Sequence, residues 1–498
     1  MRKKVVIIGS GLGGLSCGLI LSRNGYDVTV VEQGAQIGGC LQCFNRHGVK
    51  FETGMHFIGS AGEGQVLNRL LRYLGVLDDI RLSRLTPSGY DVVSLQGRQF
   101  RFANGKEPFI DTLSQDFPHE RDNLRRYFDL IESVASASSL HSLRVADSDA
   151  SPLNTVYQLR SMNDVIDEVI GDSLLRDVLV GNLPLYAAER NKTPFSTHAF
   201  ITDFYNQSAY RVVGGSDQIA LSLAKSIRQH GGQVVCCQKA TRIVCDTEKA
   251  VGVETADNYY PADIVIADIH PARVVELCDS ALLRPAYRRR VQSLPETVGG
   301  FSVYLRFKPE TVPYMNYNFY GYCQRSPWNC EAYSDEEWPK GYLYMHFCSE
   351  EQQRWAQGGV ILSYMQFSEV ERWKGTRVGH RGEDYEQMKR QHAERLIDTV
   401  CRDFPCLRNG IAGYDTSTPL TYMDYTGTEC GSMYGIAKDI TLGPASRIHH
   451  RTKVPNLLLT GQNINSHGIL GVLVGTVVTC SELLTSEYIF NEIISANT

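Results

Sequence analysis

The segment VVIIGSGLGG, residues 5–14, decides the fold. Its first four residues form a short apolar run that predicts a buried parallel strand, and a helix-like run at 15–24 leaves the glycine turn. In such a turn Gly9 permits the tight bend, Gly11 lets the backbone approach a pyrophosphate, and Gly14 lets the helix pack closely on the strand. The helix N-terminus adds free N–H groups and a positive dipole end. The segment therefore predicts a site for the phosphates of a dinucleotide.

An acidic residue stands at the spacing that completes this pattern. The run 27–31 predicts a second strand, and Glu32 follows it at the expected distance of about 20 residues from the turn. A carboxylate there accepts hydrogen bonds from a ribose diol and repels a 2′-phosphate, so NADP is disfavoured. A glycine doublet at 38–39 and strand-like segments through residue 57 come next, where an NAD domain would proceed to another crossover helix. This order is typical of FAD-binding folds of the two-dinucleotide type.

No second glycine fingerprint occurs downstream in the sequence. We therefore expect no dedicated NAD(P)H domain. Electrons are expected to enter or leave through an unidentified donor or acceptor.

Composition bounds the remaining possibilities. The 498 residues, 43% of them hydrophobic, supply two cores rather than one, so we expect two domains. The net charge of −5 gives no sign of the excess positive charge that nucleic-acid-binding proteins have, so we expect no nucleic-acid partner. Fourteen scattered cysteines and the absence of a cleavable signal predict a cytoplasmic protein with reduced thiols. Four glycines interrupt the weakly charged stretch 457–479, which argues against a membrane span and leaves peripheral membrane contact open.

The order of predicted elements divides the chain into an α/β fold with an insertion. We expect a Rossmann-like FAD-binding domain from residues 1–75, 200–290 and 445–498, and an inserted α+β substrate-binding domain from residues 76–199 and 291–444. The return to the first domain after the insertion is marked by a helix and four strands, predicted at 217–230, 234–237, 240–245, 251–255 and 264–267.

Four segments spread over nearly the whole chain carry a resemblance to a known family. They are the glycine turn with Glu32 and the glycine doublet, FETGMHFIG at 51–59, Gly214-Gly215 with its following helix, and LTGQN at 459–463 with the glycines of 468–475. In these segments the chain resembles the flavin amine oxidase-like superfamily, within it the branch of phytoene desaturases, carotenoid isomerases and retinol saturases. The segment 51–59 and Tyr434-Gly435 look closer to retinol saturases than to phytoene desaturases.

The resemblance implies one noncovalently bound FAD. A helix beginning near Gly468 would aim its N–H groups at the pyrimidine end of the flavin ring, where negative charge accumulates on reduction, although the same glycines also suit close helix packing. The family usually has Asp where this chain has Glu52 and Asn463, which leaves open how the ribityl and phosphate groups are held. The strand backbone at Ala240 would pair with the adenine. The predicted cofactor-binding residues are Gly9, Gly11, Leu12, Gly13, Gly14, Glu32, Gln33, Gly38, Gly39, Gly54, Met55, His56, Ala240, Gly461, Gln462, Asn463, Gly468, Ile469 and Leu470.

The resemblance also implies the chemistry, in which flavin exchanges a hydride at N5. Reduction of an alkene needs a hydride at one carbon and a proton at the other, so an acid near the ring would serve it. His56, His467 and Tyr434 are the catalytic candidates by motif position, with a structural, hydrogen-bonded histidine as the competing interpretation. The aromatic-rich run 314–344 fits a tunnel wall for an apolar substrate and, equally well, a sheet core.

The cysteines raise a rival interpretation. Cys40 and Cys43 form a C-x-x-C, which suggests a flavin-linked disulfide reductase, but such enzymes often space the pair by four residues and carry a second nucleotide fingerprint. We therefore expect no redox dithiol. No cysteine group has a second pair at ligand spacing, so no metal site is predicted.

These observations rank the functions. Retinol saturase-like reduction of a carbon–carbon double bond in an apolar polyene or isoprenoid lipid is expected first. Carotenoid-type desaturation and redox-neutral cis–trans isomerisation use the same site geometry and remain alternatives. A non-catalytic prenyl-lipid-binding protein of the GDP-dissociation-inhibitor type is a third possibility, against which the intact phosphate turn argues.

Overall fold

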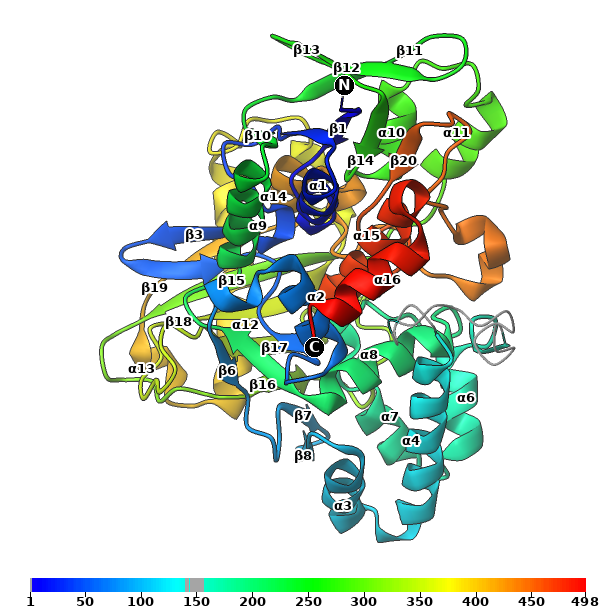
Figure 1. Cartoon of the computed structure of the whole chain (residues 1–498). Coiled ribbons are helices and arrows are strands. Elements are labelled where there is room, and N and C mark those ends of the chain that lie inside the picture. The colour runs from blue at the N-terminus through cyan, green and yellow to red at the C-terminus, as the bar shows by residue number, and fades with distance from the viewer. Residues whose placement is uncertain (1, 139–142, 144–155) are drawn as a thin grey trace.

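A parallel sheet of five strands organises the part of the chain that carries the glycine turn (Figure 1). The structure is a computed structural model that describes residues 2–138, 143 and 156–498. The strand order is β10-β2-β1-β14-β20, and every neighbouring pair is parallel. Distant segments thus become neighbours, because Ile7 pairs with Val30 on one side and with Ile266 on the other. The strands are β1 (Lys4–Ile8), β2 (Asp27–Val31), β10 (Gln233–Val235), β14 (Ile264–Ala267) and β20 (Leu457–Leu459).

Alternate side chains of the strands point to opposite faces of this sheet, and different elements pack on each face. Val5 and Ile7 point into a core shared with helices α1 (Leu12–Arg23), α9 (Asp217–Gln229) and α15 (Gly468–Leu484), and α1 contacts both other helices. Val6 and Ile8 point the opposite way, into a second core. That core is shared with a three-stranded sheet and a short helix, whose elements are β11 (Ala240–Cys245), β12 (Ala250–Thr255), β13 (Tyr259–Pro261) and α10 (Pro271–Leu277).

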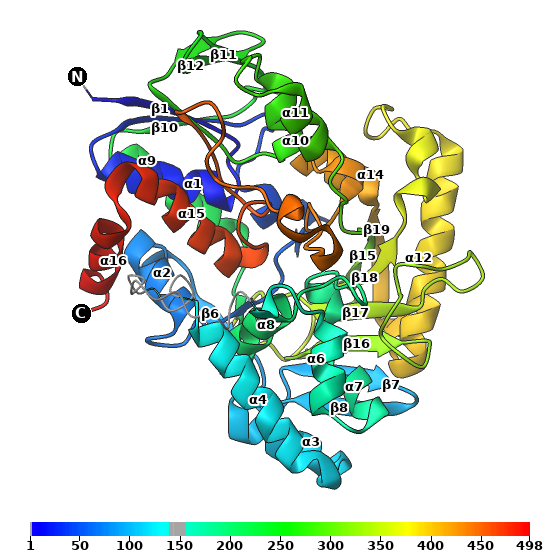
Figure 2. The same ribbon diagram turned by 90° about the vertical axis from the view of Figure 1, so that its right-hand side faces the viewer.

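A mixed sheet of seven strands forms the second large element, in the order β19-β15-β18-β17-β16-β7-β8. All neighbours are antiparallel except β16 and β7. One face packs on α12 (Glu383–Asp403), and the other faces a layer of helices (Figure 2). The strands are β7 (Asp91–Leu95), β8 (Arg98–Phe102), β15 (Gly299–Phe307), β16 (Asn318–Tyr322), β17 (Gly341–His346), β18 (Gly358–Met365) and β19 (Ile411–Ser417). The helices of the layer are α3 (Lys106–Asp116), α4 (Arg121–Ser136), α6 (Met162–Val169), α7 (Ser173–Leu179) and α8 (Phe195–Gln207).

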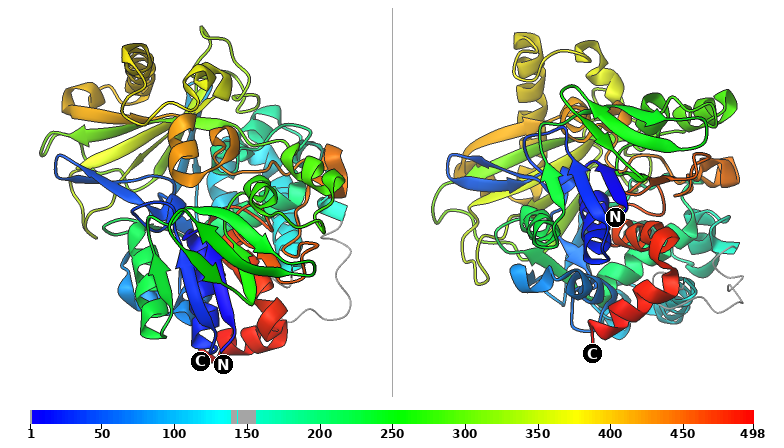
Figure 3. Two further views of the ribbon diagram at one scale, coloured as in Figure 1. Left: turned by 90° about the horizontal axis from the view of Figure 1, so that it is seen from above. Right: turned by 45° about the horizontal axis from the view of Figure 1, so that its top comes forward.

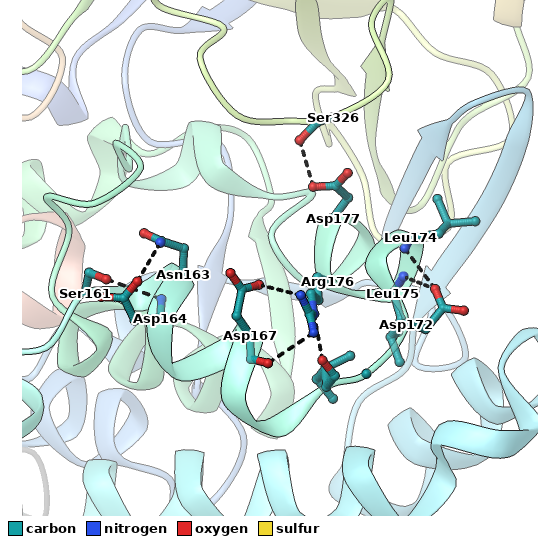
Figure 4. Close-up of polar contacts among 12 residues, drawn as sticks. Ser161, Asn163, Asp164, Asp167, Asp172, Leu174, Leu175, Arg176, Asp177 and Ser326 are labelled. Carbon is teal, nitrogen blue, oxygen red and sulfur yellow. Dashed lines mark hydrogen bonds and ion pairs between the residues drawn. The ribbon is translucent and has the colours of Figure 1, made fainter.

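Polar contacts fix this helical layer to the sheet (Figure 4). The Asp172 carboxylate caps α7 by accepting hydrogen bonds from two backbone N–H groups of its first turn, at 2.8 and 3.0 Å. The Ser326 hydroxyl donates to Asp177 of the same helix at 2.7 Å. Ser326 lies in the loop that follows β16, so this contact ties the helix to the loop between β16 and β17.

Smaller elements surround the two sheets (Figure 3). The hairpin of β3 (Cys43–Arg46) and β4 (Val49–Glu52) reaches the large sheet, where β4 contacts β18. A separate three-stranded sheet has the order β5-β9-β6. The remaining bounds are β5 (Ile58–Gly59), β6 (Leu82–Arg84), β9 (Ala209–Val212), α2 (Val66–Leu74), α11 (Pro285–Gln292), α13 (Leu407–Gly410), α14 (Pro419–Thr426) and α16 (Ser486–Ser495).

The sequence-based boundaries are close to those observed. The strands predicted at 27–31, 240–245 and 264–267 occur as stated, and the helix predicted at 217–230 ends at Gln229. The strand predicted at 234–237 ends earlier, at Val235, because Cys237 has a φ of +57° that leaves the extended region. The first helix begins at Leu12 rather than 15. Within the described part of the chain, no helix combines the length and apolarity that a membrane crossing requires.

Candidate functional site

A cavity of about 720 Å³ runs from the carboxyl ends of the parallel strands to the seven-stranded sheet. Open α/β sheets bind their ligands at this edge. Predicted site residues that line it are Gly9, Gly11, Leu12, Gly13, Glu32, Gln33, Gly38, Gly39, Gly54, Met55, His56, Ala240, Tyr434, Gly461, Gln462, Asn463, Gly468 and Ile469. Gly14, His467 and Leu470 are not among the residues that line it.

The backbone of the glycine turn packs closely against the backbone at Asp268 and Gly461. Gly9 has a φ of +97°, and a Cβ there would lie 2.6 Å from the carbonyl oxygen of Asp268. A Cβ at Gly13 would lie 3.0 Å from the amide nitrogen of Gly461. Larger residues would therefore push the two turns apart. The N-cap of α1 is Gly11, which supplies no side-chain acceptor. The Gly14 N–H of the first turn donates to Asp268, and the N–H groups that precede it at this helix end are available to an anion.

Glu32 is held rigidly at the end of β2. Its carboxylate accepts hydrogen bonds from the backbone N–H of Ser10 at 2.9 Å, from the Ser10 hydroxyl at 2.6 Å and from the N–H of Gly34 at 2.7 Å. The side chain is buried at the cavity edge. A fixed carboxylate in this place suits a ribose diol and opposes a second phosphate.

Asp268 is a site residue that sequence reasoning missed. It follows β14, lines the cavity, and accepts a hydrogen bond from the N–H of Gly14 at 2.7 Å. Burial raises the pKa of its carboxyl to about 7, the Glu32 charge adds to the rise, and the Gly14 hydrogen bond opposes it. Its signal in the sequence was its place directly after the strand predicted at 264–267, where a parallel strand delivers ligand-facing residues.

His56 lies in the wall of the cavity beside a buried carboxylate. Its Nδ1 is buried without a hydrogen bond and lies 3.7 Å from Oε2 of Glu52. That distance is longer than a hydrogen bond but short enough for strong electrostatic interaction.

Tyr434 and His467 lie together, with ring centroids 4.7 Å apart, yet face different surroundings. Tyr434 lines the cavity and donates its hydroxyl to the carbonyl oxygen of Pro184 at 2.9 Å. His467 is the N-cap of α15, and burial, with a contribution from Lys438, lowers its pKa to about 3. His467 is therefore neutral at physiological pH and ill suited to donate a proton.

The end of the cavity at the seven-stranded sheet is apolar. Leu343, Met345 and Leu362 line it from paired strands β17 and β18. From the aromatic-rich run, Phe319, Tyr342 and Tyr344 belong instead to the core on the α12 face. These aromatic residues form a sheet core, and aliphatic neighbours on the opposite face line the cavity.

A family model described as flavin containing amine oxidoreductase matches residues 12–371. The chain belongs to this flavin-containing family. The prediction of a flavin-dependent oxidoreductase enzyme is thereby confirmed, and its cofactor is a flavin.

Individual relatives extend the match over the whole chain. All-trans-retinol 13,14-reductase of Homo sapiens is 27% identical, over 98% of this chain and 86% of that protein. The protein of the same name from Rattus norvegicus is 26% identical over the same shares. Prolycopene isomerase of Daucus carota is 22% identical, over 97% of this chain and 80% of its own length.

Solved structures share the fold. An oxidoreductase from Methanosarcina mazei matches with a TM-score of 0.64 and 16% identity, over 96% of this chain and all 100% of its own. Cyclohexylamine oxidase of Brevibacterium oxydans matches with a TM-score of 0.59 and 15% identity, over 100% of this chain and 99% of its own. The predicted α/β flavoprotein fold class is confirmed.

The residues of the cavity fit the cofactor of this flavin family. The glycine turn and the α1 N-terminus would hold a pyrophosphate, and Glu32 would hold a ribose. The N-terminus of α15 has no side-chain cap and would face the ring. A flavin bound there supplies hydride exchange, and the protein supplies position and protons.

Cys40 and Cys43 lack the features of a redox dithiol in this flavin site. Burial raises the pKa of both thiols to about 11, with Asp268 adding to the rise at Cys40 and Glu52 at Cys43. Reactive cysteines have lowered pKa values in electropositive surroundings. Raised thiol pKa values are the opposite of what a redox dithiol needs, and the absence of dithiol chemistry at this pair stays a prediction.

Proposed function

We propose that the protein binds one FAD noncovalently and reduces a carbon–carbon double bond of an apolar polyene. The observation that carries the proposal is one continuous cavity that joins the phosphate turn to the aliphatic wall of Leu343, Met345 and Leu362. FAD rather than FMN is favoured because the turn and Glu32 offer sites for a pyrophosphate and an adenosine ribose.

The mixed lining of the cavity favours an isoprenoid substrate. His56 and Tyr434 line the same cavity as the apolar residues Leu343, Met345 and Leu362. Ligand pockets of this kind enclose an apolar body and orient it by a small number of polar contacts. The relatives named all-trans-retinol 13,14-reductase support a retinoid-like polyene as the substrate class.

Isomerisation without net electron transfer is the second candidate. It is favoured by the similarity to prolycopene isomerase, at 22% identity over 97% of this chain. The same cavity would bind an extended polyene in either reaction, and desaturation would use it in the opposite direction. The three reactions differ in the change in mass of the product.

The proposal has a direct test in the reoxidation of flavin. Purified holoprotein would be reduced with dithionite, freed of excess reductant, and mixed anaerobically with all-trans-retinol. We expect the oxidised flavin absorbance to return, while a saturated alcohol of similar length leaves the flavin reduced. Reoxidation by neither compound, with conversion of the polyene to a geometric isomer of equal mass, would favour isomerisation instead.

A further inference from the structure

A buried carboxylate stands directly behind His56. Glu52 ends β4, and the chain then turns so that His56 approaches it, with 3.7 Å between Nδ1 and Oε2. The His56 side chain is 9% exposed and the Glu52 side chain is 7% exposed. His56 lines the cavity, whereas the Nδ1 atom facing Glu52 is fully buried. The pair therefore connects the protein interior to the place where a substrate would lie.

A buried guanidinium supplies positive charge on the interior side. Arg211 of β9 is 2% exposed and donates hydrogen bonds to the carbonyl oxygens of His56 at 3.3 Å and Tyr317 at 3.1 Å. It also donates to Oδ1 of Asn318 at 3.0 Å, whose amide in turn donates to Asp91 at 2.8 Å. Burial raises the pKa of Glu52, while His56 and Arg211 oppose the rise. Arg211 thus favours the ionised form of Glu52 and fixes the backbone of His56.

The other charged and titratable neighbours have partners of their own. Lys50 of the same strand donates to Asp217 at 2.6 Å and to the Gly214 carbonyl at 2.9 Å. Cys43 lies opposite Glu52 in the β3–β4 hairpin, and burial raises its thiol pKa to about 11. The backbone N–H of Ser216, the N-cap residue of α9, further opposes the rise in the pKa of Glu52. His56 is left as the route from the Glu52 carboxylate to the cavity.

We propose that His56 donates the proton in the reduction and that Glu52 is its positioning residue, holding the imidazolium through Nδ1. The inference rests on the proposed function. The proton leaves Nε2 of His56 for one alkene carbon as the other carbon receives a hydride supplied by the reduced cofactor. The alkene gains two electrons, the cofactor loses two, and His56 becomes neutral until solvent reprotonates it.

The titration of His56 in the FAD-loaded protein, without substrate, tests the pairing. The NMR signal missing from His56→Gln assigns His56, and its midpoint is compared in wild type, Glu52→Gln and Glu52→Asp. Removing the carboxylate should lower the midpoint, and the Asp variant should restore part of the shift. An unchanged midpoint in Glu52→Gln, with flavin absorbance retained, would overturn the proposal.

A matched control comes from a second Glu–His pair. Glu369 lies 3.0 Å from Nε2 of His392, and that histidine is on α12, across the sheet from the cavity. Glu369→Gln should leave the His56 midpoint unchanged. A shift of equal size in this variant would mean that general destabilisation moves the signal, which would also overturn the proposal.

Single-turnover kinetics distinguish a failure of the Glu52–His56 pairing from a failure of the proposed function. Single-turnover reduction of the polyene should slow above the midpoint of His56, and in Glu52→Gln this fall should begin at lower pH. His56→Gln should slow the step by about a hundredfold. If no polyene is reduced while the midpoint still shifts, the proposed function fails and the pairing stands. If polyene reduction proceeds in His56→Gln at the wild-type rate, the donor role fails while the function stands.

Discussion

Asp268 shows how a single buried carboxylate couples two distant parts of the chain. It accepts the N–H of Gly14 from 254 positions away, and a Cβ at Gly461 would lie 2.4 Å from its Oδ1. The carboxylate thus holds the turn that follows β1 and lies closely against the turn that follows β20. It does so at an electrostatic cost, because burial raises its pKa from 3.8 to about 7.

Asp268→Asn should stabilise the cofactor-free protein at about pH 8. The folded-state pKa lies above that of the unfolded chain, so the ionised carboxylate costs stability progressively as pH rises from about 4 to about 7. Asn keeps an oxygen that can accept the Gly14 N–H and carries no charge. We expect the melting temperature to exceed that of wild type by a few degrees at about pH 8, and the excess to shrink progressively as the pH falls toward about 4. Equal melting temperatures at both pH values would contradict this electrostatic cost.

Gly11→Val should abolish FAD binding. A Cβ at this position would lie 2.6 Å from Oδ2 of Asp268, which Gly14 holds in place, and the larger side chain would also occupy the pyrophosphate approach. Gly475→Ala is the control, because its Cβ would meet its nearest neighbour at 3.7 Å, an ordinary contact. Flavin absorbance of the purified variants measures the effect. A yellow Gly11→Val protein with wild-type flavin content would refute this phosphate site.

At the scale of elements, the two faces of the seven-stranded sheet have different roles. One face packs in the core against α12, and the other contributes residues that line the cavity. Phe319 and Tyr344 point to the α12 side, while Leu343 and Leu362 point to the cavity. The alternation along strands predicts such a division, but a sequence alone does not say which face meets the ligand. For this reason the aromatic residues of 314–344 were equally compatible with a tunnel and a core.

Leu362→Trp should obstruct the apolar end of the cavity and leave the cofactor in place. The indole would fill space next to Leu343, whereas the glycine turn and Glu32 lie at the other end. We expect kcat/KM for a long polyene to fall about tenfold or more, with flavin content unchanged. Leu362→Met, which conserves volume, serves as the control. Loss of activity in the Met variant equal to that in the Trp variant would argue against a steric role for this wall.

At the scale of the whole molecule, the sequence predicts local motifs but not contacts between segments that lie far apart in the chain. The strand–turn–helix of residues 5–24 and Glu32 lie within one short segment, so their spacing alone predicts a dinucleotide site. Asp268 and Arg211 enter the site through strands whose neighbours come from other parts of the chain. Arg211 carries no motif, and its role follows from burial and hydrogen bonds that only the folded chain creates.

The route of electrons is also a property of the whole chain. The sequence has one glycine fingerprint, so NADH and NADPH should reduce the bound flavin slowly, while dithionite should reduce it readily. Anaerobic stopped-flow absorbance measures both rates. Rapid bleaching by micromolar NADPH would show that a nicotinamide site exists without a fingerprint.

The most direct test of polyene reduction is the mass and label of the product. Reduced holoprotein, mixed anaerobically with all-trans-retinol in deuterated water, should yield a product with two added hydrogens. One should be deuterium from solvent at a single carbon, and the other the hydride from the cofactor, provided that the N5 hydrogen does not exchange before transfer. A product of unchanged mass, or a polyene left intact while an amine reduces the oxidised flavin, would contradict the proposed reaction.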